Sequence, residues 1–99
     1  MLFTPELFMK VLDGSKTQTR RINQRFKVGD VVGIVAEPYN GYKGTIKITH
    51  IKHEKINLIS GSDIIKEGLA TREEFMELWE SIYPGCEDAV VYTFGLIKD

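Results

Sequence analysis

The sequence predicts a small α+β domain in which about five strands form a barrel, with one helix at the start and one or two later in the chain. Three observations lead to this fold class. The 99 residues, 42% apolar and 27% charged, suit one compact domain over 1–99. Helical and alternating apolar patterns follow one another along the chain. The last apolar segment alternates cleanly, which predicts a closing strand paired with an early one.

The first element is a short amphipathic helix. Thr4 before Pro5 is typical of an N-cap followed by proline at the first helical position. Apolar side chains then recur at helical spacing up to Gly14, where we expect the helix to stop. The next segment, 16–22, is rich in Thr and Arg without an apolar period, so we interpret it as an exposed strand or a turn leading into one.

The middle of the chain predicts a hairpin. A nearly continuous apolar run over 31–36 indicates a central strand. Asn40-Gly41 is a strong hairpin signal and leads into a second strand over 45–52. The side chains of this strand that we expect to face inward are Ile46, Ile48 and Ile51.

Two later helices and a final strand complete the expected order. Ser62 is predicted to cap a short helix over 63–67 that stops at Gly68. Thr71 and Glu74 have capping-box spacing and predict a second helix, which ends at Pro84-Gly85. Its side chains expected to face inward are Phe75, Leu78, Trp79 and Ile82. Alternation over 89–96 predicts the closing strand.

Composition narrows the function classes. No apolar run approaches the roughly 20 residues that span a bilayer, and the start of the chain lacks a basic segment followed by an apolar stretch. We therefore expect a cytoplasmic, untargeted monomer with no membrane partner. One cysteine, Cys86, and two histidines do not have the spacing of a zinc site. We expect neither a metal nor a cofactor.

The formal net charge of −1 is a cancellation between two halves. Residues 1–55 hold ten Lys and Arg against five Asp and Glu, a net +5, while 56–99 hold three against nine, a net −6. Either the surface is polarised and attracts a polyanion on one side, or two solvated faces pair with each other.

The densest polar cluster follows the first helix, over 14–21. Its members are Gly14, Ser15, Lys16, Thr17, Gln18, Thr19, Arg20 and Arg21. A glycine turn with cations and hydroxyls suits phosphate or carbonyl oxygens, because glycine allows close backbone approach and the cations donate charge-assisted hydrogen bonds. The P-loop spacing is absent, which argues against a nucleotide triphosphatase. A solvated edge strand is the alternative interpretation.

These residues also carry a resemblance to a known family. The strings that carry it are Leu12 to Arg21 after Phe3, Phe26 to Asp30, Glu67-Gly68-Leu69, Phe75 and Ile82 to Gly85. Together they resemble an ASCH domain (activating signal cointegrator homology) over nearly the whole chain. The Lys-Thr-x-Thr-x-Arg string and the late Tyr-Pro-Gly resemble the small bacterial acetylcytidine amidohydrolases and also ASCH proteins of phages and prophages. The resemblance implies a PUA-like β-barrel with a ligand cleft, a fold associated with RNA.

The resemblance also implies a catalytic role for three residues. Lys16 would be the proton acceptor, Thr19 the nucleophile and Glu67 the proton donor, with Glu73 and Glu74 as rival carboxylates. A threonine hydroxyl needs a neighbouring base, and burial beside arginines could lower the pKa of a lysine enough to make it one. Lys16 and Thr19 would lie on opposite faces of a regular strand, so a shared site requires a turn or bulge at Thr17 and Gln18. The expected ligand-binding residues are Gly14, Thr17, Arg20, Arg21 and Tyr39.

Three functions follow as hypotheses. The first is a domain that binds RNA or a modified nucleoside and removes the acetyl group from acetylcytidine. The second is a non-catalytic RNA-binding module in which Lys16, Arg20 and Arg21 hold phosphates. The third is a phage-type accessory domain that binds another protein through the acidic helix over 73–80.

Overall fold

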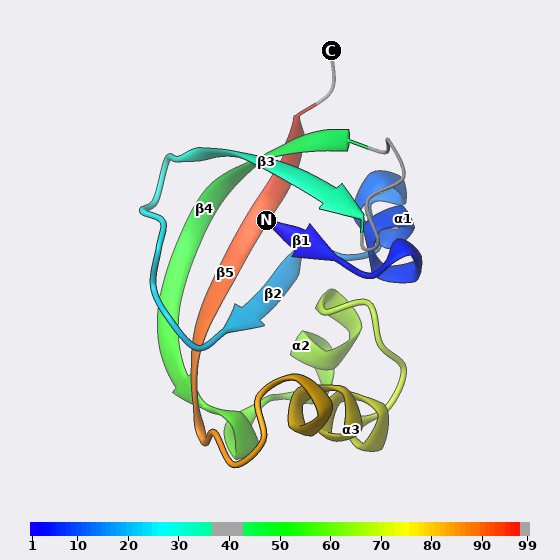
Figure 1. Ribbon diagram of the computed structural model, residues 1–99, viewed down its shortest axis with the longest axis vertical. Coiled ribbons are helices and arrows are strands. Elements are labelled where there is room, and N and C mark those ends of the chain that lie inside the picture. Colours follow the sequence, from blue (N-terminus) through cyan, green and yellow to red (C-terminus); the bar gives the residue numbers. More distant parts are fainter. Residues whose placement is uncertain (37–42, 98–99) are drawn as a thin grey trace.

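The predicted α+β class is confirmed by the computed structural model, which describes residues 1–36 and 43–97 (Figure 1). Within these ranges the chain forms one five-stranded sheet with three α-helices and a short 3-10 helix. The elements are β1 (Leu2–Phe3), α1 (Pro5–Asp13), β2 (Gln18–Arg21), β3 (Val31–Ala36), β4 (Lys43–Lys55), η1 (Ile56–Leu58), α2 (Gly61–Lys66), α3 (Arg72–Ile82) and β5 (Asp88–Ile97).

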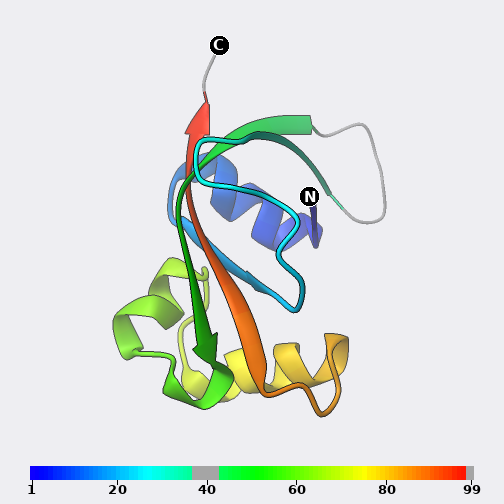
Figure 2. The same cartoon turned by 90° about the vertical axis from the view of Figure 1, so that its left-hand side faces the viewer.

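The sheet is a curled half-barrel with the strand order β1-β3-β4-β5-β2. The long strands β4 and β5 run antiparallel through its centre (Figures 1 and 2), and β3, predicted to be central, is an interior strand that pairs with β1 on one side and β4 on the other. The predicted closure is present in part. β5 pairs antiparallel with the early strand β2, while β1 pairs parallel with β3 and forms the other edge. The side chain of Arg21 bridges the two edges, since its Nη2 donates to Leu2 O at 3.0 Å.

The first helix forms as its capping signals predict. Thr4 is the N-cap, and its hydroxyl accepts from the Leu7 backbone N–H at 3.4 Å. Pro5 occupies the first helical position, where its missing N–H costs nothing. Gly14 ends the helix with a φ of 87°, a conformation that glycine adopts without strain. α1 packs against β1 and β3 and buries Phe8 and Val11 in the main core.

The hairpin between β3 and β4 is confirmed by their antiparallel register, although Tyr39 and Asn40-Gly41 lie outside the described residues. β4 is longer than expected and contains a bulge at Thr49, where the register shifts between Ile48 and His50. Successive side chains of a regular strand alternate, so Ile48 and Ile51 would face opposite sides without the extra residue. The bulge lets Ile51 pack against the same core as Ile48.

The start of α2 differs from the expectation. Ser60, not Ser62, is the N-cap, because its backbone is extended and its Oγ accepts from the Asp63 N–H at 3.1 Å. Ser62 already lies in the first turn. No helix in the described ranges is long and apolar enough to cross a membrane.

The start of α3 follows its capping signal, since Thr71 accepts from the Glu74 N–H at 3.1 Å. Phe75 and Trp79 are buried as predicted, whereas Ile82 is 54% exposed. The difference arises because the last turn of α3 lies at the edge of a cavity that Ile82 lines.

Two apolar clusters hold the structure together. The larger lies between the sheet and α1 and contains Phe8, Ile46 and Tyr92. The smaller lies between α2, α3 and the start of β5 and contains Phe75 and Trp79. β2 lies between the two, and the side chains of Gln18, Thr19 and Arg20 are buried. Of the two interpretations of 16–22, the exposed strand is therefore wrong, because helices cover a segment whose sequence is polar, whereas the turn leading into a strand agrees with β2 beginning at Gln18.

Candidate functional site

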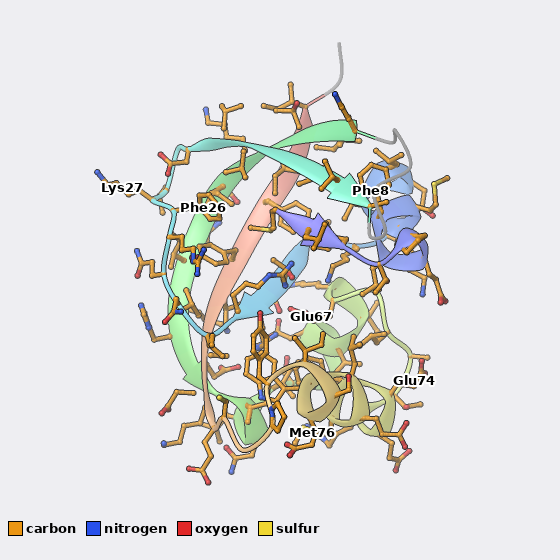
Figure 3. The ribbon with its side chains drawn as sticks, viewed as in Figure 1. Phe8, Phe26, Lys27, Glu67, Glu74 and Met76 are labelled. Atoms are coloured by element: carbon orange, nitrogen blue, oxygen red, sulfur yellow. The ribbon has the colours of Figure 1, made fainter. Side chains whose placement is uncertain are left out.

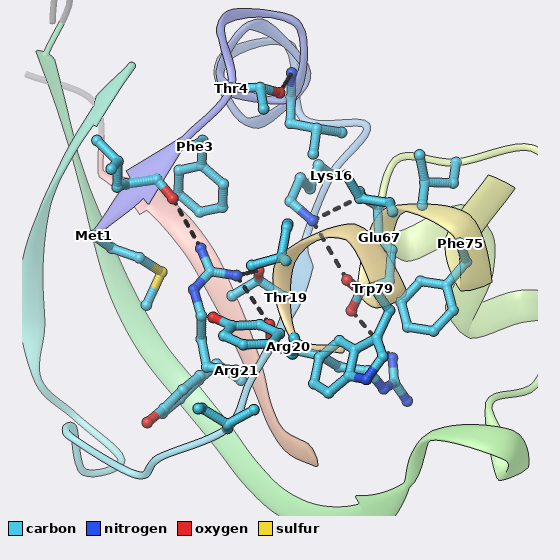
Figure 4. Close-up of a pocket in the computed structure, with 18 of the residues that line it drawn as sticks. Met1, Phe3, Thr4, Lys16, Thr19, Arg20, Arg21, Glu67, Phe75 and Trp79 are labelled. Atoms are coloured by element: carbon cyan, nitrogen blue, oxygen red, sulfur yellow. Dashed lines mark hydrogen bonds and ion pairs between the residues drawn. The ribbon is translucent and has the colours of Figure 1, made fainter. Parts of the chain in front are cut away.

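A cavity of about 720 Å³ opens between β2, the N-terminal segment and α3 (Figure 4). Its volume lies within the range of small-molecule sites, roughly 300 to 1,000 Å³. Polar side chains from β2 and from the end of α2 also line this cavity. The aromatic side chains that line its walls are Phe3, Phe26, Phe75, Trp79, Tyr83 and Tyr92.

Lys16 reaches the cavity because it precedes the regular part of β2. Its backbone N–H donates to Lys10 O at 3.0 Å, which holds the residue against the end of α1. The side chain is 3% exposed. Its Nζ donates to Gln18 O at 2.8 Å and to Glu67 O at 2.7 Å, and lies 3.6 Å from Glu67 Oε1. Burial lowers the pKa of Lys16 to about 8, although the Glu67 carboxylate opposes this effect.

Glu67 is placed beside Lys16 by the end of α2. Gly68 follows with a φ of 89°, and a Cβ there would lie 3.3 Å from Lys16 Cβ, so the chain turns as close to Lys16 as glycine permits. Glu67 is buried, whereas the rivals Glu73 and Glu74 are exposed in the first turn of α3. Figure 3 shows Glu67 near β2 and Glu74 on the outer side of α3. Of the three candidates, Glu67 lines the cavity.

β2 separates two sets of polar side chains by its alternation. On one face Arg20 Nη1 donates to Gln18 Oε1 at 2.7 Å, and on the other Arg21 Nη1 donates to Thr19 Oγ1 at 2.5 Å. Because Lys16 lies before the strand, this alternation does not force it away from Thr19. Lys16, Thr19 and Glu67 all line the cavity, as the shared site requires.

Arg20 joins the cavity to a buried ionic network. Its guanidinium contacts Glu67 Oε2 at 3.1 Å, Glu54 Oε1 at 2.7 Å and Asp63 Oδ2 at 3.5 Å. Lys52 adds contacts of 3.5 Å to both Glu54 and Asp63. Buried charges of this kind are tolerated only when paired, and removing one partner is costly. The network therefore fixes the position of the Glu67 carboxylate.

Comparison with known proteins identifies the fold. No protein-family model and no curated protein matches the chain in sequence. Among solved structures, a protein of Enterococcus faecalis V583 described with the DUF984 family is 20% identical, with a TM-score of 0.75 over 97% of this chain and 78% of its own. A variant of the Zymomonas mobilis ASCH protein is 18% identical, with a TM-score of 0.75 over 99% of this chain and 70% of its own. The chain has an ASCH-type fold.

A third structure agrees with this assignment. The ASCH domain of Lactobacillus crispatus JV V101 is 17% identical, with a TM-score of 0.71 over 89% of this chain and 68% of its own. The α+β PUA-like class is thus confirmed. At these identities the likeness establishes the fold, and the chemistry of the cavity rests on the residues of this chain.

The expected ligand-binding residues fall into three groups. Arg20 and Arg21 line the cavity. Gly14 and Thr17 are not among its lining residues, and their backbones have structural roles. Gly14 ends α1, while Thr17 N donates to Lys66 O at 2.9 Å and Thr17 O accepts from Phe94 N at 3.0 Å. Tyr39 lies outside the described residues.

Several residues of the cavity are missed by sequence reasoning. Helical spacing identifies Phe75 and Trp79 as core residues, which they are, but does not indicate that they also line a cavity. Glu54 carries no local signal, since it lies 34 residues from its partner Arg20. The opposite net charges of the two halves of the sequence do indicate part of this site. Lys16 and Arg20 from the basic half pair with carboxylates of the acidic half, so at this site the two halves meet.

Proposed function

We propose that the cavity binds RNA or a nucleoside containing N-acetylated cytidine and hydrolyses its amide bond. The observation that carries this proposal is the convergence of Lys16, Thr19 and Glu67 on one cavity. They come from the loop after α1, from β2 and from the end of α2. A base, a hydroxyl nucleophile and an acid are the groups that amide hydrolysis through a covalent intermediate requires.

The walls of the cavity support a nucleobase ligand. Proteins that bind single-stranded RNA or nucleosides commonly stack bases on aromatic side chains. Trp79 and Tyr83 lie on the wall formed by α3 and its end, with ring centroids 4.8 Å apart, while Phe26 and Tyr92 form an edge-to-face pair at 5.7 Å. A nucleobase that contacts these side chains would lie in the same cavity as Lys16, Thr19 and Glu67.

Lys16 and Glu67 together would supply the acid and the base. In the proposed mechanism Lys16 Nζ, which lies 3.6 Å from Glu67 Oε1, first carries the proton. Transfer of that proton from Lys16 to Glu67 Oε1 creates a neutral amine and a carboxylic acid in one step. Burial disfavours the charged form of Lys16, because desolvation penalises its ammonium.

The reaction then follows in two balanced steps. Neutral Lys16 accepts the hydroxyl proton of Thr19, and Oγ1 attacks the acetyl carbonyl while Arg21 Nη1, already within hydrogen-bond distance of Oγ1, stabilises developing negative charge. Glu67 donates its proton to the departing amine, which leaves cytidine and an acetyl ester on Thr19. Water hydrolyses this ester, restoring the threonine and releasing acetate.

The test is the release of cytidine from N-acetylated cytidine, measured chromatographically for the native protein and two matched variants. Thr19→Val keeps the shape of the side chain without its hydroxyl, and we expect it to lower the rate by at least about a hundredfold. Thr19→Ser keeps a hydroxyl and should retain measurable hydrolysis. If Thr19→Val hydrolyses the substrate as fast as the native protein, Thr19 is not the nucleophile.

The non-catalytic RNA-binding module is a second candidate, favoured by the contacts of Lys16. Its ammonium donates to Gln18 O and Glu67 O and lies 3.6 Å from Glu67 Oε1, contacts that a purely structural lysine would also make. Binding of an acetylated RNA with no release of acetate would support this alternative.

A further inference from the structure

The charged side chains that line the cavity carry more positive than negative charge. Among the described residues, the lining cations are Lys16, Arg20, Arg21 and Arg25, and the lining carboxylate is Glu67. Lys16 pairs with Glu67, and Arg20 is surrounded by Glu54, Asp63 and Glu67. Arg21 and Arg25 have no carboxylate within ion-pair distance in the described parts of the chain. Two positive charges of the cavity are thus left without a direct counter-ion.

The hydrogen bonds that Arg21 donates within the described residues all go to neutral oxygen atoms. Its Nη1 donates to Thr19 Oγ1 at 2.5 Å and to Arg20 O at 3.0 Å, and its Nη2 donates to Leu2 O at 3.0 Å. The guanidinium also lies over the Phe3 ring, 5.2 Å from the centroid. An arginine has five N–H groups, so two remain for another acceptor. Burial also lowers the pKa of Arg21, as expected for a partly buried cation without an anion.

Arg25 lies at the exposed edge of the same cavity. Its backbone N–H donates to Tyr92 Oη at 2.9 Å, which fixes the start of its side chain beside an aromatic wall. Arg25 is the one exposed charged side chain among the described lining residues, since its exposed neighbours there are apolar (Leu2, Ile22 and Ile82) or neutral and polar (Thr4, Asn23 and Ser81). A negatively charged group at this mouth would therefore be attracted specifically to the arginines.

We infer that the ligand of this cavity carries a phosphate group, held by Arg21 where the edges β1 and β2 meet and by Arg25 at the mouth. The substrate is then a nucleotide, free or within RNA, and not a neutral nucleoside. This inference rests on the proposed function, because the base of that nucleotide occupies the aromatic walls. A phosphate supplies the missing counter-charge and accepts charge-assisted hydrogen bonds from a planar guanidinium.

Binding to three probes tests the inference: cytidine, cytidine 5′-monophosphate and the trinucleotide CpCpC without terminal phosphates. Trp79 is the one tryptophan of the chain and lines the cavity, so its fluorescence reports occupancy directly. We expect the monophosphate to bind the native protein about tenfold or more tightly than cytidine, equivalent to about 1.4 kcal/mol. This difference should shrink as salt is added, since screening weakens exposed charge pairs.

Substitution of the two arginines tests which residues bind the phosphate. Arg21→Gln and Arg25→Gln should each reduce the preference for the monophosphate over cytidine. Lys27→Gln is the matched control, because Lys27 is an exposed cation two residues from Arg25 that does not line the cavity. It should keep the full preference. Since Arg25 is exposed, its variant remains informative even if Arg21→Gln is unstable.

The outcomes separate this inference from the proposed function. Equal binding of cytidine and its monophosphate overturns the phosphate site but leaves the nucleoside site. A preference that survives in both arginine variants overturns the assignment to these residues. Failure of all three probes to bind overturns the proposed function and the inference with it. If the phosphate is recognised, tighter binding of CpCpC than of the monophosphate identifies RNA as the source, and the reverse identifies a free nucleotide.

Discussion

Lys16 shows how burial sets the chemistry of a single side chain. Its ammonium is almost fully buried, and burial lowers its pKa from 10.5 to about 8. The unfolded chain therefore binds more protons than the folded one between these two values. Stability from this group is lost as the pH falls toward 8 and recovered as the pH rises toward 10.5. Below pH 8 the cost of burying the charge is present in full, on the order of 3 kcal/mol.

Replacing Lys16 by methionine should remove this pH dependence. Methionine keeps an unbranched side chain of similar length without an ionisable group, so the free energy of unfolding of Lys16→Met should rise less between pH 8 and 10 than that of the native protein. Chemical denaturation at several pH values measures both curves. Parallel curves would show that Lys16 is not the group whose pKa burial lowers in the folded state.

The C-terminal end of the short helix α2 positions the Glu67 side chain. Six residues are too few for a helix to be stable alone, so its position depends on caps and tertiary contacts. At its end, Lys16 Nζ, Thr17 N and Lys10 Nζ donate to the carbonyls of residues 66–68. These contacts hold Glu67 against β2, and Gly68 permits the close approach.

Gly68→Ala should disturb this end more than an alanine elsewhere in the helix. The positive φ of Gly68 costs a non-glycine residue about 1 to 2 kcal/mol, and the added Cβ would press on Lys16 Cβ. Gly61→Ala is the matched control, since Gly61 lies at the other end of α2 with no atom within 4 Å of an added Cβ. Thermal unfolding should show a clear loss for Gly68→Ala and little change for Gly61→Ala. Equal effects of the two substitutions would argue against the close contact.

Ser60→Ala and Ser62→Ala test the start of the same helix. Loss of an N-cap side chain costs about 1 kcal/mol, so Ser60→Ala should destabilise the protein by that order. Ser62 does not accept a backbone N–H of α2 in the described hydrogen bonds, and its replacement should cost less. Unfolding free energies from denaturant titration compare the two, and a larger loss for Ser62→Ala would contradict the observed cap.

Across the whole molecule, the elements that the sequence predicts correctly are those whose signals lie in neighbouring residues. Capping residues and apolar periodicity predict α1, α3, the β3–β4 hairpin and the closing strand β5 because each depends on neighbours in the chain. The exposed-strand interpretation of 16–22 was wrong because distant helices bury β2. The bulge at Thr49 has no local signal, and neither do the partners Glu54 and Asp63 of Arg20. The roles proposed for Lys16, Thr19 and Glu67 came from a resemblance, and the convergence of these residues on one cavity is visible only in the fold.

The pH dependence of kcat/KM for acetylated cytidine tests the proposed mechanism most directly. The pair Lys16–Glu67 must hold one proton to act as base and acid together, and above the pKa of about 8 that proton is lost. We therefore expect kcat/KM to be highest below pH 8 and to fall about tenfold for each further pH unit above it. A kcat/KM that instead rises through pH 8, or no cytidine released at any pH, would contradict the proposed roles of Lys16 and Glu67.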